Sequence, residues 1–114
     1  MLPERVFNLL ADPTRLRALL LIHAENEVCV CELTHALQAS QPKISRHLAL
    51  MRDAGLVAPR REGTWMHYSL AGDLPDWVGA LLGTTSEHLR DCDPFAADRA
   101  RLAAMNDRPG KACA

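Results

Sequence analysis

Apolar residues recur at intervals of three and four along most of this chain, which is the spacing of buried helix faces. The intervals predict helices over about residues 6–10, 13–23, 31–38, 42–54 and 75–90. We expect a sixth helix at about 95–105, after the break at Pro94. Asp12 followed by Pro13, and Pro42 after a polar turn, mark helix starts.

In one stretch of the chain the apolar residues recur at every second position instead. Residues 65–70 alternate between apolar and other side chains, which predicts a half-buried strand. Residues 56–61 supply its partner, an edge strand because of Pro59, and residues 62–64 the turn. We expect Trp65 to lie in the core. Short helices, a tight turn, a longer helix and a hairpin predict a fold that is mainly α with a small β-hairpin, a winged helix-turn-helix.

Length and composition indicate an ordinary globular protein. The 114 residues suffice for one core, and 48% of them are hydrophobic and 24% charged. We expect residues 1–92 to form the winged helix-turn-helix and dimerisation domain, and residues 93–114 a C-terminal helix and mobile tail. No signal peptide or membrane span is evident, so we expect a cytoplasmic protein without a membrane partner.

Positive charge is concentrated in one region. Residues 40–68 have a balance of +3, whereas the rest of the chain has a balance of −4, for a net charge of −1. A basic stretch on an acidic protein is consistent with a local nucleic-acid contact.

Cys29 and Cys31 form a thiol pair just ahead of the predicted DNA-reading unit. They are too close in sequence for a relaxed disulfide, and thiols suit a soft ion. Side chains two apart on a regular helix point about 200° apart, so we expect ion binding to distort the first turn of the third helix. The helix N-terminus favours the thiolate form. The alternative is a pair of small buried residues near a cap.

Three segments carry a family resemblance. Residues 29–33 read Cys-Val-Cys-Glu-Leu, residues 40–48 read Ser-Gln-Pro-Lys-Ile-Ser-Arg-His-Leu, and residues 61–63 read Arg-Glu-Gly. Together they resemble the ArsR (ArsR/SmtB) family of metal- and metalloid-sensing repressors, most closely its arsenic-responsive branch, over about residues 3–90.

The resemblance implies a homodimer that represses a resistance operon by binding double-stranded operator DNA, without a cofactor. Trivalent arsenic or antimony, the inducer, would release it by binding Cys29 and Cys31. Arsenic-responsive members carry a third cysteine where this chain has Thr34. Cys92 and Cys113 are the candidates for a third sulfur, and water or a cellular thiol could replace both.

Candidate DNA contacts lie on the predicted recognition helix and the hairpin. Side chains near the start of the recognition helix face the major groove in helix-turn-helix proteins, and basic hairpin residues suit the backbone and minor groove. The candidates are Ser40, Gln41, Lys43, Ser45, Arg46, His47, Arg60, Arg61 and His67.

Other functions compete with this interpretation. A thiol redox sensor would pair Cys29 or Cys31 with a later cysteine, and a repressor for cadmium, lead or zinc would use the same thiols. An enzyme with a Cys29–His35 dyad lacks an orienting acid and an oxyanion loop. A constitutive DNA-binding protein leaves the thiol pair without a role.

Overall fold

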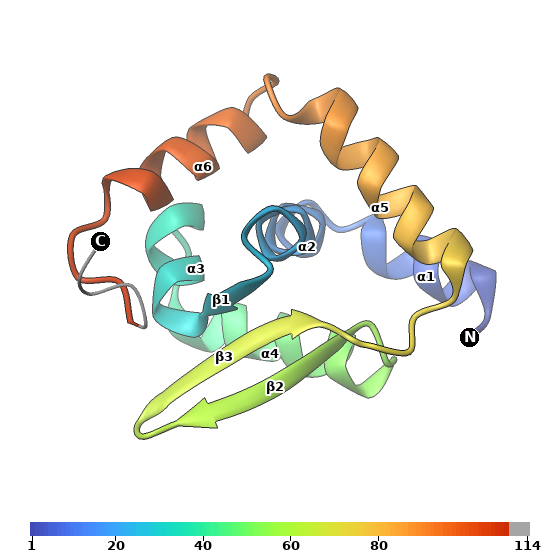
Figure 1. The fold of residues 1–114 in the computed structure, drawn as a ribbon, viewed down its shortest axis with the longest axis horizontal. Helices are drawn as coiled ribbons and strands as arrows, with labels where there is room; N and C mark the ends of the chain where they lie inside the picture. Colours follow the sequence, from blue (N-terminus) through green and yellow to red (C-terminus); the bar gives the residue numbers. More distant parts are fainter. Residues whose placement is uncertain (110–114) are drawn as a thin grey trace.

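The computed structural model describes residues 1–109, which form six helices and three strands (Figure 1). In chain order they are α1 (Pro3–Leu10), α2 (Pro13–Glu25), β1 (Glu27–Cys29), α3 (Val30–Leu37), α4 (Gln41–Asp53), β2 (Val57–Glu62), β3 (Trp65–Leu70), α5 (Asp76–Leu89) and α6 (Phe95–Ala104). Within the described residues, no helix has both the length and the apolar character needed to cross a membrane.

Two helices begin at the caps that the sequence predicts. Asp12 Oδ2 accepts a hydrogen bond from the backbone N–H of Arg15 at 3.0 Å at the start of α2. Ser40 Oγ accepts from the N–H of Lys43 at 3.4 Å at the start of α4. Each cap satisfies one of the N–H groups that a helix leaves unpaired. The chain leaves α4 through Gly55, whose φ of +82° suits a residue without a Cβ.

The predicted hairpin is present, and a third strand joins it. β2 and β3 pair antiparallel from Val57 opposite Leu70 to Glu62 opposite Trp65, around a tight turn with Gly63 at φ +61°. β1 pairs with the free side of β3, giving the order β1-β3-β2. The sheet therefore has three strands rather than two. The sequence did not reveal β1 because three residues are too few to show alternation.

The core is organised around α2, which lies at the centre of the molecule (Figure 1). The run Ala18–Ile22 is buried on every side, because α2 packs against all the other helices and against β1 and β3. Leu33 of α3 and Leu48 of α4 are fully buried in the same cluster. The two helices that build the DNA-reading unit thus rest on one shared core.

The C-terminal helix belongs to this core as well. α6 packs against α3 and α2, and its Leu102 is buried with the core residues. Asp98 of α6 is buried and accepts hydrogen bonds from Arg17 at 2.7 and 2.8 Å and from Arg101 at 2.8 Å. The boundary expected at residue 92 falls between α5 and α6, two helices that cover the same core.

Candidate functional site

The two thiols meet where β1 ends and α3 begins. Cys29 is the last residue of β1 and the N-cap of α3, with extended backbone angles, and Cys31 lies in the first helical turn. Their sulfur atoms are 3.3 Å apart. The expected divergence of the two side chains does not occur, because Cys29 lies outside the helix and is free of its 100° rotation per residue. The sulfurs converge without unwinding the first turn.

The Cys31 thiol of this pair is held in its protonated form. Burial, followed by the neighbouring Cys29 and the charge of Glu32, raises the pKa of the Cys31 thiol to about 12. The hydrogen bond from the Glu32 backbone acts in the opposite direction but is the smallest contribution. The expected preference for thiolate at this helix N-terminus is therefore wrong for Cys31, because desolvation outweighs the helix dipole.

Glu32 anchors the thiol segment and was missed at the sequence level. Its side chain is 1% exposed, and its Oε1 accepts from the backbone N–H of Cys29 at 2.7 Å. With the Cys29 sulfur facing the Glu32 backbone N–H, the two residues form a capping box in which cysteine replaces serine or threonine. The spacing Cys-x-x-Glu was the signal that could have identified it.

A residue from the far end of the chain completes this site. Arg108 donates from Nε to Glu32 Oε2 and from a terminal nitrogen to Glu25 Oε1 at 2.7 Å. Its side chain is largely buried, so this part of the expected mobile tail is tied to the thiol segment. No sequence pattern indicated the contact, which spans 76 positions.

A third sulfur does not join the pair within residues 1–109. Cys92 is exposed between α5 and α6, and in the described residues no group of three or more His, Cys, Asp or Glu side chains is arranged to hold a metal ion. Cys113 lies outside the described residues. Thr34, at the position of the expected third cysteine, donates its hydroxyl to the carbonyl of Cys31 at 2.8 Å.

The helix-turn-helix consists of α3 and α4, and the start of α4 is exposed. α4 buries Ile44, Leu48 and Met51, as its spacing predicts. The side chains of Ser40, Gln41, Lys43 and Arg46 are exposed, and that of Ser45 is half-buried. Gln41 Nε2 donates to Ser45 Oγ at 3.1 Å, which links two of the candidate contacts.

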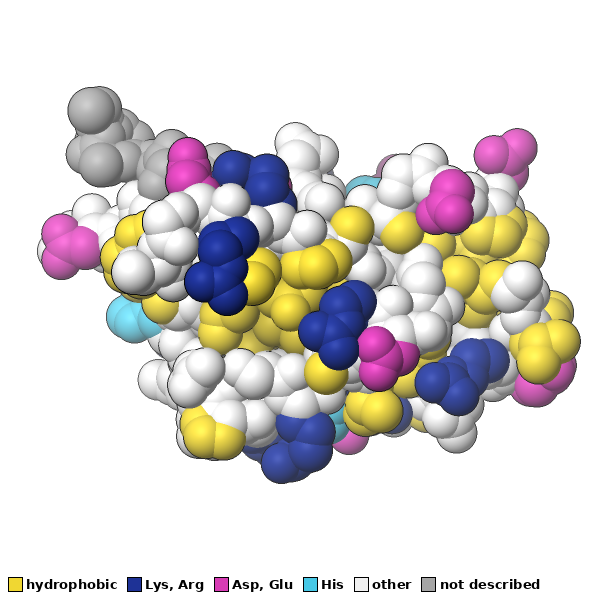
Figure 2. All heavy atoms as spheres, turned by 90° about the horizontal axis from the view of Figure 1, so that it is seen from below, with side chains coloured by type: hydrophobic (Ala, Val, Ile, Leu, Met, Phe, Trp, Pro, Cys, Tyr) yellow, Lys and Arg dark blue, Asp and Glu magenta, His cyan; other side chains and the backbone are white. Residues whose placement is uncertain are grey.

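The hairpin extends beside α4 as a wing. Figure 2 shows the face of the molecule that carries the hairpin, with Lys and Arg side chains spread across it. Arg61 is exposed and Arg60 forms hydrogen bonds to Glu27 at 2.7 and 2.9 Å. Trp65 is exposed near the tip of the wing, so the expectation that it lies in the core is wrong.

Two predicted DNA contacts are buried instead. His67 is 4% exposed and lies beneath Arg60, its neighbour on the adjacent strand. The two ring nitrogens of His67 are 3.9 Å from Glu27 and 3.8 Å from Glu62. Sheet register places it on the same face as those charged side chains, which cover it.

His47 is 9% exposed because the helical rotation turns it from the outer face of α4 toward α2. Its Nδ1 is 3.3 Å from Arg15 and its Nε2 is 3.9 Å from Asp12. Burial lowers the pKa of His47, so the imidazole is a neutral structural group rather than an exposed cation.

Comparison with known proteins identifies the family. The family described as "Bacterial regulatory protein, arsR family" matches residues 12–58, which include α2, α3 and α4. The arsenic resistance transcriptional regulator ArsR1 of Pseudomonas putida is 52% identical over 108 residues, covering 94% of this chain and 82% of the relative. The chain belongs to the ArsR family.

A second relative and a solved structure agree with this assignment. The arsenical resistance operon repressor of Escherichia coli is 49% identical over 82 residues, covering 72% of this chain and 70% of the relative. HlyU from Vibrio cholerae matches with a TM-score of 0.67 and 30% identity over 75% of this chain and 88% of that structure. This ArsR-family chain is a winged-helix DNA-binding transcriptional regulator and not an enzyme.

Proposed function

We propose that this protein represses an arsenic-resistance operon and leaves its operator when trivalent arsenic or antimony binds Cys29 and Cys31. The observation that carries the proposal is the 3.3 Å separation of the two sulfurs at the N-cap of α3. The named arsenical resistance regulators among its relatives support the choice of inducer.

The protonated state of the Cys31 thiol suits arsenite. Arsenite at neutral pH is uncharged As(OH)3, and each new arsenic–sulfur bond replaces an arsenic–oxygen bond. The displaced hydroxide leaves with the thiol proton as water, so two thiols give (RS)2AsOH and two water molecules with no change in charge or oxidation state. The remaining hydroxide exchanges with water or a cellular thiol, which completes the coordination.

A divalent cation meets a higher cost at the same sulfurs. Cadmium or zinc binds thiolates, so it must displace protons into solvent, and a thiol with a pKa of about 12 resists this at neutral pH. The same property disfavours oxidation at Cys31, because thiolates are the species that oxidise readily. The choice of a trivalent metalloid over a soft divalent ion therefore rests mainly on the arsenical resistance regulators among the relatives.

The capping box supplies a route from the thiols to the DNA. An atom bonded to Cys29 Sγ displaces the sulfur from its position facing the Glu32 backbone N–H, and thereby disturbs the capping box at the first turn of α3. α3 packs against α4 and shares its core, so a shift of the first turn alters the orientation of α4. Binding at the sulfurs thereby lowers affinity for the operator.

We assign the DNA contacts to the exposed or half-buried members of the predicted set. Gln41 suits a bidentate contact to adenine, and Lys43 and Arg46 suit guanine or phosphate. The buried His47 and His67 are left out. The assigned residues are Ser40, Gln41, Lys43, Ser45, Arg46, Arg60 and Arg61.

A homodimer through α1 and α5 fits the surface of these helices. Phe7 of α1 and Trp77 of α5 are 54% and 38% exposed, and their rings stack with centroids 6.2 Å apart. Leu2 is exposed next to α1. Grouped exposed aromatic and aliphatic side chains mark contact surfaces, and a two-fold dimer matches an operator with two half-sites.

The direct test measures release from operator DNA by fluorescence anisotropy. Arsenite should release the wild type, while a Cys29→Ser/Cys31→Ser double variant should bind DNA and remain bound. Cys92→Ser is the matched control, because it removes an exposed thiol outside the pair. Normal release of the double variant by arsenite would refute the proposal.

A further inference from the structure

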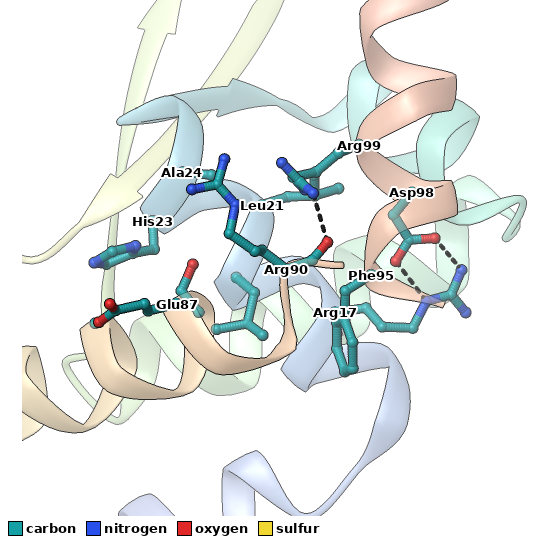
Figure 3. A pocket seen from close by; sticks show the side chains of 12 residues that line it. Arg17, Leu21, His23, Ala24, Glu87, Arg90, Phe95, Asp98 and Arg99 are labelled. Atoms are coloured by element: carbon teal, nitrogen blue, oxygen red, sulfur yellow. Dashed lines mark hydrogen bonds and ion pairs between the residues drawn. The ribbon is translucent and has the colours of Figure 1, made fainter. Parts of the chain in front are cut away.

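A cavity lies away from the thiols and the DNA-reading surface. It occupies about 360 Å³ between α2, α5 and α6, a volume typical of small-molecule sites (Figure 3). Leu20, Leu21, Ala24 and Phe95 supply apolar lining, and Gly83 leaves space where α5 passes α2. None of the residues assigned to inducer or operator lines it.

The charged side chains of this cavity leave a positive balance. Asp98 is already neutralised, because Arg17 and Arg101 both donate to it. Arg90 and Arg99 remain, opposed by Glu87, and the half-buried His23 adds a further nitrogen to the lining. In Figure 3 the guanidinium groups of Arg90 and Arg99 lie on the same side of the cavity.

Arg99 has an unused donor at this place. Its terminal nitrogen donates to the backbone carbonyl of Arg90 and lies 3.9 Å from the exposed Asp91. Its Nε is buried and has no hydrogen-bond partner among the described residues. Buried N–H groups are nearly always satisfied, so a ligand atom that accepts a hydrogen bond is the natural partner. Within residues 1–109, Arg90 likewise forms no ion pair through its side chain.

We propose that this cavity binds a small organic carboxylate with an apolar body. The carboxylate accepts from the guanidinium groups of Arg90 and Arg99, for which a planar anion with two oxygens is the matching shape. The apolar body rests on Phe95 and Leu21. The site is independent of the proposed metalloid response, since it shares no residue with the thiol pair.

The occupied site would connect two helices of different roles. α5 carries the proposed dimer surface, while α6 packs against the helix that begins at the thiols. A ligand held by Arg90 after α5 and by Arg99 of α6 fixes the two helices relative to each other. The protein would thus respond to a second small molecule besides its proposed inducer.

Benzoate is a suitable probe, and binding can be followed by isothermal titration calorimetry and by NMR shifts in the full-length protein. We expect saturable binding with a dissociation constant of roughly 1 mM or tighter for a ligand of this size. Benzyl alcohol, which lacks the charge, should not bind measurably. Absence of benzoate binding, or equal binding of benzyl alcohol, overturns the proposal.

Three variants locate the site. Arg99→Gln should weaken benzoate binding by about tenfold or more, the loss expected for a charged hydrogen bond. Arg90→Gln removes an exposed side chain and should weaken binding without disturbing the fold. Arg5→Gln removes an exposed arginine on α1, outside the cavity, and should leave affinity unchanged. Equal losses in all three variants indicate non-specific attraction and overturn the proposal.

Discussion

Arg108 donates to the carboxylate of Glu32 from 76 positions further along the chain. The other oxygen of that carboxylate holds the backbone N–H of Cys29 at 2.7 Å. A residue beyond the last helix is thereby connected through one buried side chain to the thiol pair. The contact makes the stability of the thiol segment dependent on the C-terminal region.

Loss of Arg108 should destabilise the fold. In Arg108→Gln the buried Glu32 carboxylate loses its charged partner, and we expect a cost of about 2 kcal/mol in the free energy of unfolding. Urea denaturation measures this value. Glu25→Gln is the matched control, because it removes the more exposed partner of Arg108 and should cost less than about 1 kcal/mol. If the two variants lose the same free energy of unfolding, Arg108 does not stabilise the buried Glu32 carboxylate.

Cys31 should react slowly with alkylating reagents. With a pKa raised to about 12, only about one thiol in ten thousand is ionised at pH 8, and the rate of reaction should rise about tenfold per pH unit between pH 8 and 10. Iodoacetamide labelling followed by tandem mass spectrometry measures the rate at each cysteine. The exposed Cys92 is the internal reference and should be labelled much faster. Comparable rates at pH 8 contradict the prediction.

Stability should fall below about pH 6.5 because of His47. Burial lowers the pKa of His47 below 6.5, with Arg15 acting in the same direction and Asp12 opposing it. The unfolded chain therefore takes up a proton near pH 6.5 that the folded chain binds only at lower pH. The associated stability is present above pH 6.5 and is lost as the pH falls toward the folded pKa.

Unfolding midpoints in urea at pH 5, 6 and 7 test this pH dependence. His47→Gln should flatten the change between pH 7 and pH 5. His88→Gln, which replaces an exposed histidine on α5, should leave the wild-type profile intact. A wild-type profile in His47→Gln would assign the dependence to other groups.

The two wing arginines should differ in their effect on DNA binding. Arg61 is exposed and forms no ion pair in the described residues, whereas Arg60 is held by Glu27. Arg61→Ala should therefore lower the slope of log affinity against log salt by about one for each phosphate that the side chain no longer neutralises. Arg60→Ala should lower it less. Operator titrations at several salt concentrations measure both slopes, and a larger effect of Arg60→Ala would reverse the assignment.

Most helices were predictable because their signals are local. The caps at Asp12 and Ser40 and the apolar spacing of α4 act within a few residues, so they can be read before any tertiary contact is known. The hairpin was predictable for the same reason, from alternation around a turn. β1 was not, because three residues become a strand only when β3 is beside them.

The candidate site was predictable in part. The sequence identified the two thiols and the exposed start of α4. It did not show which face each histidine occupies: His47 is turned inward by the helix, and His67 is covered by charged neighbours on the sheet. The burial of a polar side chain depends on what packs against it, which a local pattern does not contain.

The helices, the hairpin, the order of the winged helix-turn-helix and the thiol pair at its entrance follow from the sequence alone, since each depends on residues that are neighbours in the chain. Three features required the folded molecule: the sulfurs converge, the pKa of Cys31 is raised and Arg108 reaches Glu32. Two of these, the raised pKa and the Arg108 contact, depend on desolvation or on an encounter between distant segments. The convergence depends on Cys29 lying one residue outside the helix, a boundary that pairing with β3 sets.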